Sequence, residues 1–360
     1  MKALMTADTV GGVWSYAIEL AGAMAQRGVD VALATMGGPL SGSQRRDLDM
    51  SPCVDVYESR YKLEWMEEPW EDVTGSGDWL LAIADEVKPD LVHLNTYAHG
   101  HLPWQVPVMT VGHSCVLSWW RAVRGDEAPA DWARYRDLAR RSLSSSDLVV
   151  APTNAMLQSL CRDYGPLKET RVIANGRSHA RFQPARKEPI VFAAGRLWDE
   201  AKNIGALAAV AERLPWPVFA AGSAEQPGRP RREIRGIQML GVLDAAGMTD
   251  WLGRASIYAF PARYEPFGLS VLEAALSGCA LVLGDIPSLR ENWDGAAAFV
   301  SPDDPDELEG AVRRLIDDGA ARGRLAAAAR QRARLLTPER MALAYYEAYR
   351  ELMELSAVCR

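Results

Sequence analysis

A short apolar strand that leads directly into a helix is encoded by Ile257-Tyr258-Ala259-Phe260-Pro261-Ala262-Arg263-Tyr264-Glu265-Pro266-Phe267-Gly268-Leu269-Ser270-Val271-Leu272-Glu273-Ala274. The apolar residues 257–260 predict a buried strand, and the segment after Gly268 predicts a helix. The first N–H groups of a helix have no partner within it and lie at the positive end of its dipole. We therefore expect free N–H groups at Phe267, Gly268 and Leu269, which would form an anion cradle.

Two glutamates accompany this predicted cradle. Glu265 lies in the loop before the helix, and Glu273 lies inside the helix, with seven residues between them. Both could face one elongated ligand and accept hydrogen bonds from its hydroxyls, as the acidic residue of a dinucleotide site accepts from ribose. Taken alone, the pair is explained equally well by a solvated loop acid and an ordinary acid on a helix surface.

A basic loop follows the first strand of the same half. It reads Gly195-Arg196-Leu197-Trp198-Asp199-Glu200-Ala201-Lys202-Asn203 and comes directly after the apolar run 190–194. The planar guanidinium of Arg196 can grip phosphate oxygens at two points, and the ammonium of Lys202 adds a compact charge. Together they could neutralise a diphosphate leaving group without a metal ion. Two solvated surface cations are the alternative interpretation.

Short apolar runs alternate with helical stretches along most of the chain, which predicts parallel βαβ layers. Strands are expected at 3–7, 29–36, 91–94, 106–111, 148–151 and 172–174, and then at 190–194, 218–221, 257–260, 281–283 and 298–300. This pattern predicts two Rossmann-like, doubly wound α/β domains that face a cleft, at residues 1–180 and 181–337.

Two further segments carry structural expectations. Residues 338–360 predict a C-terminal helix that packs back on the N-terminal domain. Residues 57–79, which are rich in acids and contain three tryptophans, predict an irregular, mobile insertion over the cleft.

The bulk composition is typical of a soluble globular protein. Apolar residues make up 48% of the chain, and 40 basic against 47 acidic side chains give a net charge of -7, which excludes a global attraction to nucleic acid. The scattered cysteines, with no Cys-x-x-Cys pair, predict neither a disulfide framework nor a zinc site; they are Cys53, Cys115, Cys161, Cys279 and Cys359. No run approaches the roughly 18 apolar residues of a membrane span, so we expect a cytoplasmic protein.

Charge and aromatic clusters leave two open questions about partners. The arginines between 322 and 334 are most simply explained by a solvated helix face, and weak peripheral contact with an acidic membrane surface is the alternative. Eight of the twelve tryptophans fall in the first 132 residues, and we expect one or two of them to contact an acceptor while core packing explains the rest. The oligomeric state stays open.

The N-terminal half contains further candidates for ligand contact. Gly11 and Gly12 lie in the turn after the first strand, where missing side chains let a ligand approach the backbone. They do not form the Gly-x-Gly-x-x-Gly of a nicotinamide site. His113 follows the predicted strand 106–111 at the carboxyl edge where such sheets bind ligands, so a ligand contact competes with a purely structural role.

Three other histidines, His93, His99 and His101, lie close together in the sequence. Their spacing does not match a helical pair of metal ligands. We therefore expect structural roles for them and no metal site.

These motifs resemble those of glycosyltransferase family 4, whose members are retaining enzymes of the GT-B fold. Glu265 and Glu273 match the family's pair of glutamates, and residues 195–203 match its diphosphate-binding loop. The resemblance covers nearly the whole chain and is strongest at 190–305. It implies that Arg196 and Lys202 hold the donor diphosphate, that Glu273 accepts from the nucleotide ribose, and that Glu265 contacts sugar hydroxyls.

The resemblance also assigns residues in the N-terminal half. It implies that Gly11 and Gly12 face the donor phosphates or the acceptor, and that His113 approaches the transferred sugar from the acceptor side. The expected catalytic set is His113, Arg196, Lys202 and Glu265. The expected donor-binding set is Gly11, Gly12, Gly195, Arg196, Lys202, Glu265, Phe267, Gly268, Leu269 and Glu273.

Two departures from the family pattern are visible. Asn175-Gly176 matches the Asn-Gly of the interdomain region, but Arg177 and Ser178 follow where the family often has Val and an acid. Pro261-Ala262 stands where Pro-Ser is commoner, so the sugar preference is not fixed by the resemblance.

The implied activity is transfer of a hexose, with retention, from a nucleotide diphosphate sugar of the UDP or GDP type to a glycan, lipid-linked or small-molecule acceptor. No cofactor and no metal are expected, because positioning and charge stabilisation would carry the catalysis. The alternatives are a GT-B-related phosphorylase or epimerase, and a non-catalytic module that binds sugar nucleotides.

Overall fold

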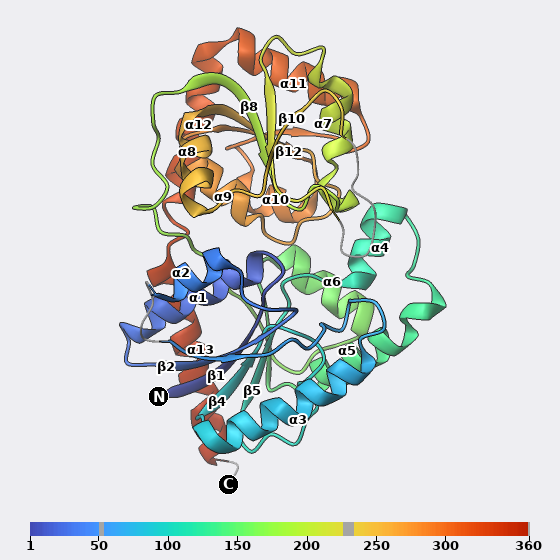
Figure 1. Cartoon of the computed structure of the whole chain (residues 1–360), viewed down its shortest axis with the longest axis vertical. Coiled ribbons are helices and arrows are strands. Elements are labelled where there is room, and N and C mark those ends of the chain that lie inside the picture. Colours follow the sequence, from blue (N-terminus) through green and yellow to red (C-terminus); the bar gives the residue numbers. More distant parts are fainter. Residues whose placement is uncertain (50–53, 226–233, 359–360) are drawn as a thin grey trace. The chain divides into compact units, whose positions relative to one another are not determined.

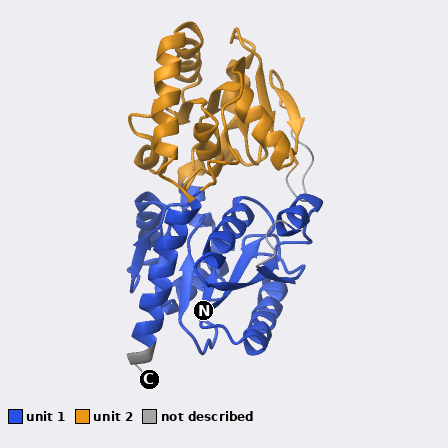
Figure 2. Ribbon diagram, turned by 90° about the vertical axis from the view of Figure 1, so that its left-hand side faces the viewer, with its two compact units in different colours: residues 1–121, 126–176, 338–360 blue, residues 122–125, 177–337 orange. Residues whose placement is uncertain are grey.

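The chain divides into two compact units in a computed structural model that describes residues 1–49, 54–225 and 234–358 (Figures 1 and 2). Unit 1 comprises residues 1–121, 126–176 and 338–360, and unit 2 comprises residues 122–125 and 177–337. Each unit is a parallel sheet covered by helices, which confirms the predicted fold class of two Rossmann-like α/β layers.

Unit 1 is built on a seven-stranded sheet in the order β3-β2-β1-β4-β5-β6-β7. Its strands are β1 (Lys2–Asp8), β2 (Asp30–Met36), β3 (Val54–Glu58), β4 (Leu91–Leu94), β5 (Val108–Val111), β6 (Leu148–Ala151) and β7 (Thr170–Val172). The helices are α1 (Gly12–Ala25), α2 (Gly42–Asp49), α3 (Trp70–Val87), α4 (Val116–Arg124), α5 (Ala133–Ser145), α6 (Asn154–Tyr164) and α13 (Pro338–Val358), with a 3₁₀ turn η1 (Ala130–Trp132).

Unit 2 is built on a six-stranded sheet in the order β10-β9-β8-β11-β12-β13. Its strands are β8 (Glu188–Ala194), β9 (Val218–Ala221), β10 (Gln238–Gly241), β11 (Ala255–Phe260), β12 (Ala280–Gly284) and β13 (Ala298–Val300). The helices are α7 (Ile204–Ala211), α8 (Ala245–Arg254), α9 (Leu269–Leu276), α10 (Pro287–Trp293), α11 (Pro305–Asp317) and α12 (Gly319–Ala333), with a 3₁₀ turn η2 (Glu200–Lys202).

The central strands are apolar along nearly their whole length because helices cover both faces of each sheet. In unit 2, β11 and β12 are buried throughout. The core on one face of that sheet includes Leu207 of α7, Val282 of β12 and Val312 of α11, all fully buried. Burial of this kind fixes the strands and therefore the loops that leave their carboxyl ends.

The final helix α13 belongs to unit 1, although residues 177–337 of unit 2 separate it from the rest of that unit in the sequence (Figure 2). It begins at Pro338, a residue suited to the first turn of a helix. It packs against α1 and buries Tyr345 and Tyr349 completely. These two tyrosines make α13 part of the wall of unit 1.

The prediction of an irregular, mobile insertion at 57–79 is wrong for its second half, because residues 70–79 begin helix α3. Glu71 and Asp72 lie in the first turn, where acids favour the helix dipole. Gly75 and Gly77 weaken the intrinsic preference for helix, but they let it approach the side chains of Tyr61 and Leu102 closely. Tertiary packing therefore overrides the propensity.

Two of the four edge strands, β3 and β10, were not revealed by the sequence pattern, whereas the edge strand β13 forms at 298–300 as predicted. β3 and β10 each end a sheet, are only partly buried, and were not predicted. The strand predicted at 172–174 is displaced and forms as β7 at 170–172. Edge strands are half-exposed, so their sequences lack the continuous apolar run that marks a central strand.

Candidate functional site

The order of the strands reverses direction between β8 and β11 in unit 2. β8 leads through the loop 195–203, and β11 leads through the loop 261–268. At such a switch point the loops from two neighbouring parallel strands diverge and leave a crevice at the carboxyl edge of the sheet, where ligands bind. The two motifs found in the sequence therefore lie in the loops that follow two adjacent strands.

Hydrogen bonds fix the two loops to each other. The N–H of Arg263 donates to the carbonyl of Ala201 at 2.8 Å. Asn203 adopts a left-handed backbone conformation with φ of 53°, and its side-chain amide donates to the carbonyl of Pro261 at 2.9 Å and to that of Pro302 at 2.7 Å. Its amide oxygen accepts from Arg263 Nη1 at 2.6 Å. Asn203 thus acts as a clamp between the loops, a role that its place in the sequence motif did not reveal.

Lys202 and Glu265 meet across this junction. Lys202 Nζ lies 2.8 Å from Glu265 Oε2, and the two side chains are only 12% and 15% exposed. The ammonium also lies 5.8 Å from the centre of the Phe260 ring, within range of a cation–π contact. The structure therefore brings together the predicted phosphate-binding cation and the predicted sugar-binding carboxylate.

The predicted anion cradle is present in shape, but the expectation of free N–H groups is wrong for two of its three members. Glu265 Oε1 accepts from the N–H of Gly268 at 3.0 Å and from that of Phe267 at 3.3 Å. Gly268 has a left-handed φ of 89°, which permits the sharp entry into α9 that starts at Leu269. An internal carboxylate therefore accepts from two of the three N–H groups at this helix start.

Arg196 is the second residue of the loop that follows β8. Its Nη2 is 3.2 Å from Asp199 Oδ2, and its side chain is 37% exposed. Asp199 is buried and also accepts from the N–H of Ala201 at 3.0 Å, so it fixes the turn η2 as well as the guanidinium. Arg196 is thus anchored on one side and accessible on another, as a phosphate-binding arginine requires.

Glu273 is engaged by a residue that sequence reasoning did not select. Arg177 Nη2 lies 2.8 Å from Glu273 Oε1, and the two side chains are 6% and 13% exposed. Arg177 is a position at which the sequence departs from the family pattern, so it could have been noticed, but the sequence did not show that it pairs with Glu273.

Tyr258 places both glutamates in one neighbourhood. Its hydroxyl donates to the carbonyl of Ala194, next to Gly195, at 3.1 Å. Its pKa is raised, first by burial and then by the nearby negative charges of Glu273 and Glu265. Both carboxylates therefore act on a side chain that is hydrogen-bonded to the start of the basic loop.

In unit 1, the predicted Gly11 and Gly12 lie at the start of α1, directly after β1, and both are exposed. Gly11 precedes the helix with φ of 139° and provides no side-chain cap. The order of the strands reverses in this sheet between β1 and β4. The glycines therefore lie beside the switch point of unit 1, as in a ligand-binding turn.

His113 follows β5 at the same edge of the sheet and belongs to a network of buried polar groups. Its Nε2 lies 2.7 Å from Asn95 Oδ1. The amide nitrogen of Asn95 donates to the carbonyl of Thr6 at 2.6 Å, so the amide oxygen must accept from His113. His113 therefore carries its proton on Nε2, which leaves Nδ1 as the acceptor nitrogen.

The expectation of a structural role for His93 and His99 agrees with their contacts. The hydroxyl of Tyr349 in α13 lies 2.6 Å from His93 Nδ1, and Ser76 Oγ lies 3.0 Å from His99 Nε2. Burial lowers the pKa of His93 to about 3 and that of His99 to about 4. Burial, with a smaller contribution from His93, lowers the pKa of His113 to about 3.

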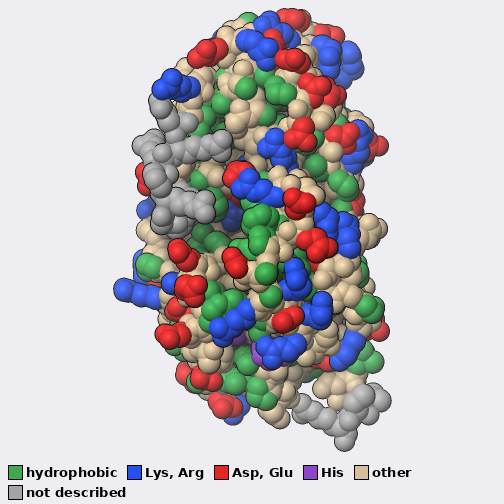
Figure 3. All heavy atoms as spheres, turned by 90° about the vertical axis from the view of Figure 1, so that its right-hand side faces the viewer, with side chains coloured by type: hydrophobic (Ala, Val, Ile, Leu, Met, Phe, Trp, Pro, Cys, Tyr) green, Lys and Arg blue, Asp and Glu red, His purple; other side chains and the backbone are tan. Residues whose placement is uncertain are grey.

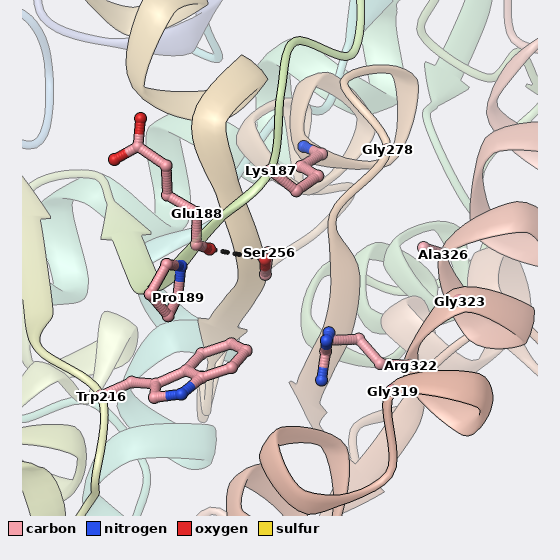
Figure 4. Close-up of a pocket in the computed structure, with 10 residues that line it drawn as sticks. All are labelled: Lys187, Glu188, Pro189, Trp216, Ser256, Gly278, Gly319, Arg322, Gly323 and Ala326. Carbon is pink, nitrogen blue, oxygen red and sulfur yellow. Dashed lines mark hydrogen bonds between the residues drawn. The ribbon is translucent and has the colours of Figure 1, made fainter.

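A pocket of about 420 Å³ lies elsewhere in unit 2, beside the starts of β8 and β11 and the first turns of α12 (Figure 4). Two of its cations are already engaged. Lys187 donates to the carbonyls of Ser277, Ala255 and Leu252 at 2.6, 2.8 and 3.1 Å, which uses all three donors of the ammonium. Arg322 donates to carbonyls at the end of α11 and lies over the ring of Trp216. These contacts are structural, and we assign no ligand to this pocket.

Other sequence features are also accounted for by packing. Trp65, Trp70, Trp79, Trp104, Trp120 and Trp132 pack against the cores of unit 1. Arg330 and Arg332 donate to backbone carbonyls of unit 2. Cys115, Cys161 and Cys279 are free thiols, and Cys53 and Cys359 lie outside the described residues.

The surface shows no large area of one charge on the face drawn in Figure 3, where acidic and basic side chains are interspersed. Across residues 1–49, 54–225 and 234–358, no helix combines the length and the apolar character needed to cross a membrane.

Comparison with known families gives two matches that together span most of the chain. Residues 10–181 match the family described as Glycosyltransferase Family 4, and residues 188–318 match Glycosyl transferases group 1. The boundary between the matches falls close to the boundary between the units.

Curated relatives are similar in part or in full. A glycogen synthase of Mycobacterium tuberculosis is 36% identical over 205 residues, which cover 52% of this chain and 50% of the relative. The chain thus matches only about half the length of that relative. A D-inositol 3-phosphate glycosyltransferase of Xylanimonas cellulosilytica is 25% identical, over 94% of this chain and 91% of the relative.

Solved structures share the fold over nearly the whole chain. A sucrose-phosphate synthase from Thermosynechococcus elongatus superposes with a TM-score of 0.84 at 20% identity, covering 99% of this chain and 100% of the other. The Anabaena protein HepE, solved in complex with UDP-glucose, gives a TM-score of 0.76 at 17% identity, covering 98% of this chain and 100% of the other. The fold of the chain is therefore the GT-B fold.

The buried histidines predict how stability depends on pH. His93 and His99 stay neutral in the folded protein but take up protons in the unfolded chain below about pH 6.5, so their contribution is complete above that pH and is lost as the pH falls toward 4. Each should reduce the free energy of unfolding by about 1.5 kcal/mol between pH 6.5 and pH 5. Urea denaturation at the two pH values measures the loss. His93→Gln should lower the pH slope, and an unchanged slope would contradict the assignment.

Proposed function

Because the chain belongs to glycosyltransferase family 4, we propose that it is a retaining hexosyltransferase that uses a nucleotide diphosphate sugar, bound by unit 2, as donor. The observation that carries the proposal is the convergence of Lys202, Glu265 and the start of α9 at the switch point of the sheet. A cation, a helix N-terminus and a carboxylate at one crevice suit a ligand that combines phosphate with hydroxyl groups.

The donor pyrophosphate would bind to Arg196, Lys202 and the first N–H groups of α9. The side chain of Lys202 is only 12% exposed, so its charge acts in a medium of lower dielectric than water. As the bond between sugar and phosphate breaks, negative charge develops on the departing diphosphate, and these groups would stabilise it without a metal ion or other cofactor. HepE was solved with UDP and with UDP-glucose, which supports UDP as the first nucleotide to test.

Glu265 would exchange its partners when the donor binds. Its carboxylate accepts from Lys202 and from the N–H groups of Phe267 and Gly268, which are the groups that the phosphate needs. Arrival of the phosphate would therefore release the carboxylate to accept from sugar hydroxyls. Glu265 thus serves as an internal substitute for the anion before it contacts the sugar.

Unit 1 would supply the acceptor side. His113 presents Nδ1 as a hydrogen-bond acceptor, and its low pKa keeps the ring neutral over the physiological range. A neutral ring can accept from a sugar hydroxyl but cannot donate through Nδ1. We assign no separate general base, because in a retaining front-face reaction the departing phosphate can take the proton of the acceptor hydroxyl.

Replacement of Lys202 by Ala should reduce transfer by about two orders of magnitude, because one charged donor to the leaving group is lost. The measurement is the steady-state rate with UDP-glucose and GDP-mannose as donors and a panel of sugar acceptors. Arg213→Ala, which removes an exposed cation of the same unit, should retain the wild-type rate. Full activity of the Lys202 variant would refute the diphosphate assignment.

Glu265→Gln should separate nucleotide binding from transfer. Because the variant removes the negative charge that competes for Lys202, free UDP should bind about threefold to tenfold more tightly, while transfer becomes slower. Titration calorimetry with UDP and the rate of transfer measure the two effects. Weaker binding of UDP by this variant would contradict the exchange of partners.

Transfer should continue in excess EDTA at within about twofold of its original rate, because protein cations take the electrostatic role that a metal has in other enzymes. The assay compares the rate before and after chelation and after Mg²⁺ is restored. Loss with EDTA and recovery with Mg²⁺ would overturn metal independence.

A separate incubation with phosphate and a disaccharide, without nucleotide, distinguishes phosphorolysis from transfer.

A further inference from the structure

Arg177 is a nearly buried cation that the expected donor site does not include. Arg177 as a whole is 5% exposed, and its Nη2 lies 2.8 Å from Glu273 Oε1. Its guanidinium carbon lies 5.2 Å from the centre of the buried Phe182 ring. Its backbone N–H donates to the carbonyl of Leu336 at 3.0 Å. The side chain is therefore held by an ion pair and an aromatic face, and the backbone by a hydrogen bond.

We propose that Arg177 is a positioning residue of the nucleotide site, which holds the Glu273 carboxylate in the orientation that accepts from both ribose hydroxyls of a nucleoside diphosphate. The inference rests on the proposed function, because it takes Glu273 as the ribose contact. It adds Arg177 to the residues of the nucleotide site. Preference for a nucleotide with both ribose hydroxyls would then depend on Arg177.

The helix alone does not fix the carboxylate of Glu273. A glutamate side chain has three rotatable bonds, and Glu273 lies in the second turn of α9, beyond the N–H groups that hold Glu265. The bond from Arg177 to Oε1 restrains the orientation of this carboxylate. A carboxylate has about four acceptor positions, more than one ion pair occupies.

Because the pair is largely buried, the ionised state of Glu273 depends on the charge of Arg177. An ionised carboxylate with 13% exposure is costly without a counter-charge, so loss of the guanidinium would leave it to turn toward water or to take up a proton. In either case it no longer presents a fixed acceptor. Loss of Arg177 should therefore remove ribose recognition, although Arg177 itself need not touch the nucleotide.

The test compares two ligands that differ only at the ribose, UDP and 2′,3′-dideoxy-UDP, by titration calorimetry. Hydrogen bonds to a charged acceptor predict that wild-type protein binds UDP about tenfold to a hundredfold more tightly than the dideoxy form. In Arg177→Gln, this ratio should fall to within about threefold, mainly through weaker binding of UDP. Arg177→Lys, which keeps the charge but loses the planar fork, should give an intermediate ratio.

Two further variants calibrate the result. Glu273→Gln should reduce the ratio as Arg177→Gln does. Arg254→Gln breaks a different ion pair of unit 2, with Glu188 at the start of β8, and should retain the wild-type ratio. Circular dichroism and thermal melts establish which variants fold, and if Arg177→Gln does not, the intermediate ratio of Arg177→Lys carries the test.

The possible outcomes separate this inference from the proposed function. If the wild-type protein binds none of UDP, GDP and ADP, the proposed function fails. If it binds and discriminates the dideoxy form, but both Arg177 variants keep the wild-type ratio, Arg177 is only structural and the inference is overturned while the function stands. If wild-type protein binds UDP without discrimination, the ribose role of Glu273 fails, and this inference fails with it.

Discussion

The reversal of strand order between β8 and β11 is the constraint on which the site in unit 2 depends. It makes the loops 195–203 and 261–268 leave the sheet side by side, and the Asn203 clamp then sets their spacing. The helix α9 starts where the second loop ends, so its N-terminus lies at this junction without further adjustment. A change that moved one strand relative to the other would separate Arg196 and Lys202 from Glu265 and the start of α9.

Each charged side chain proposed to bind the donor has an internal partner of opposite charge. Lys202 is paired with Glu265, Arg196 with Asp199, and Glu273 with Arg177. Two of these pairs are largely buried, where an unpaired charge would be costly. The three pairs together therefore carry no net charge. Binding of an anionic ligand becomes an exchange of partners, which reduces the desolvation that a set of bare cations would impose.

The sequence predicted the two parallel layers because central strands are buried on both faces and form continuous apolar runs, as β6 and β12 do. It missed the edge strands β3 and β10, which lack that pattern, and it missed most of helix α3, where Gly75 and Gly77 serve packing. The motifs placed Lys202 and Glu265 in loops that follow two strands of the same half, and the structure shows that these strands, β8 and β11, are neighbours. It could not show that Glu265 accepts from the cradle or that Arg177 reaches Glu273, because those contacts depend on side-chain direction in three dimensions.

The assignment of α13 to unit 1 has a consequence for the order of folding during translation. A nascent chain that has reached Gly176 lacks Tyr345 and Tyr349, so α1 and His93 have not yet acquired the helix that covers them. Nearly all of unit 2 emerges from the ribosome before that helix is made. The usual vectorial order, in which the N-terminal domain is finished first, is therefore inverted, and the first half must wait with an apolar face exposed while the second is completed.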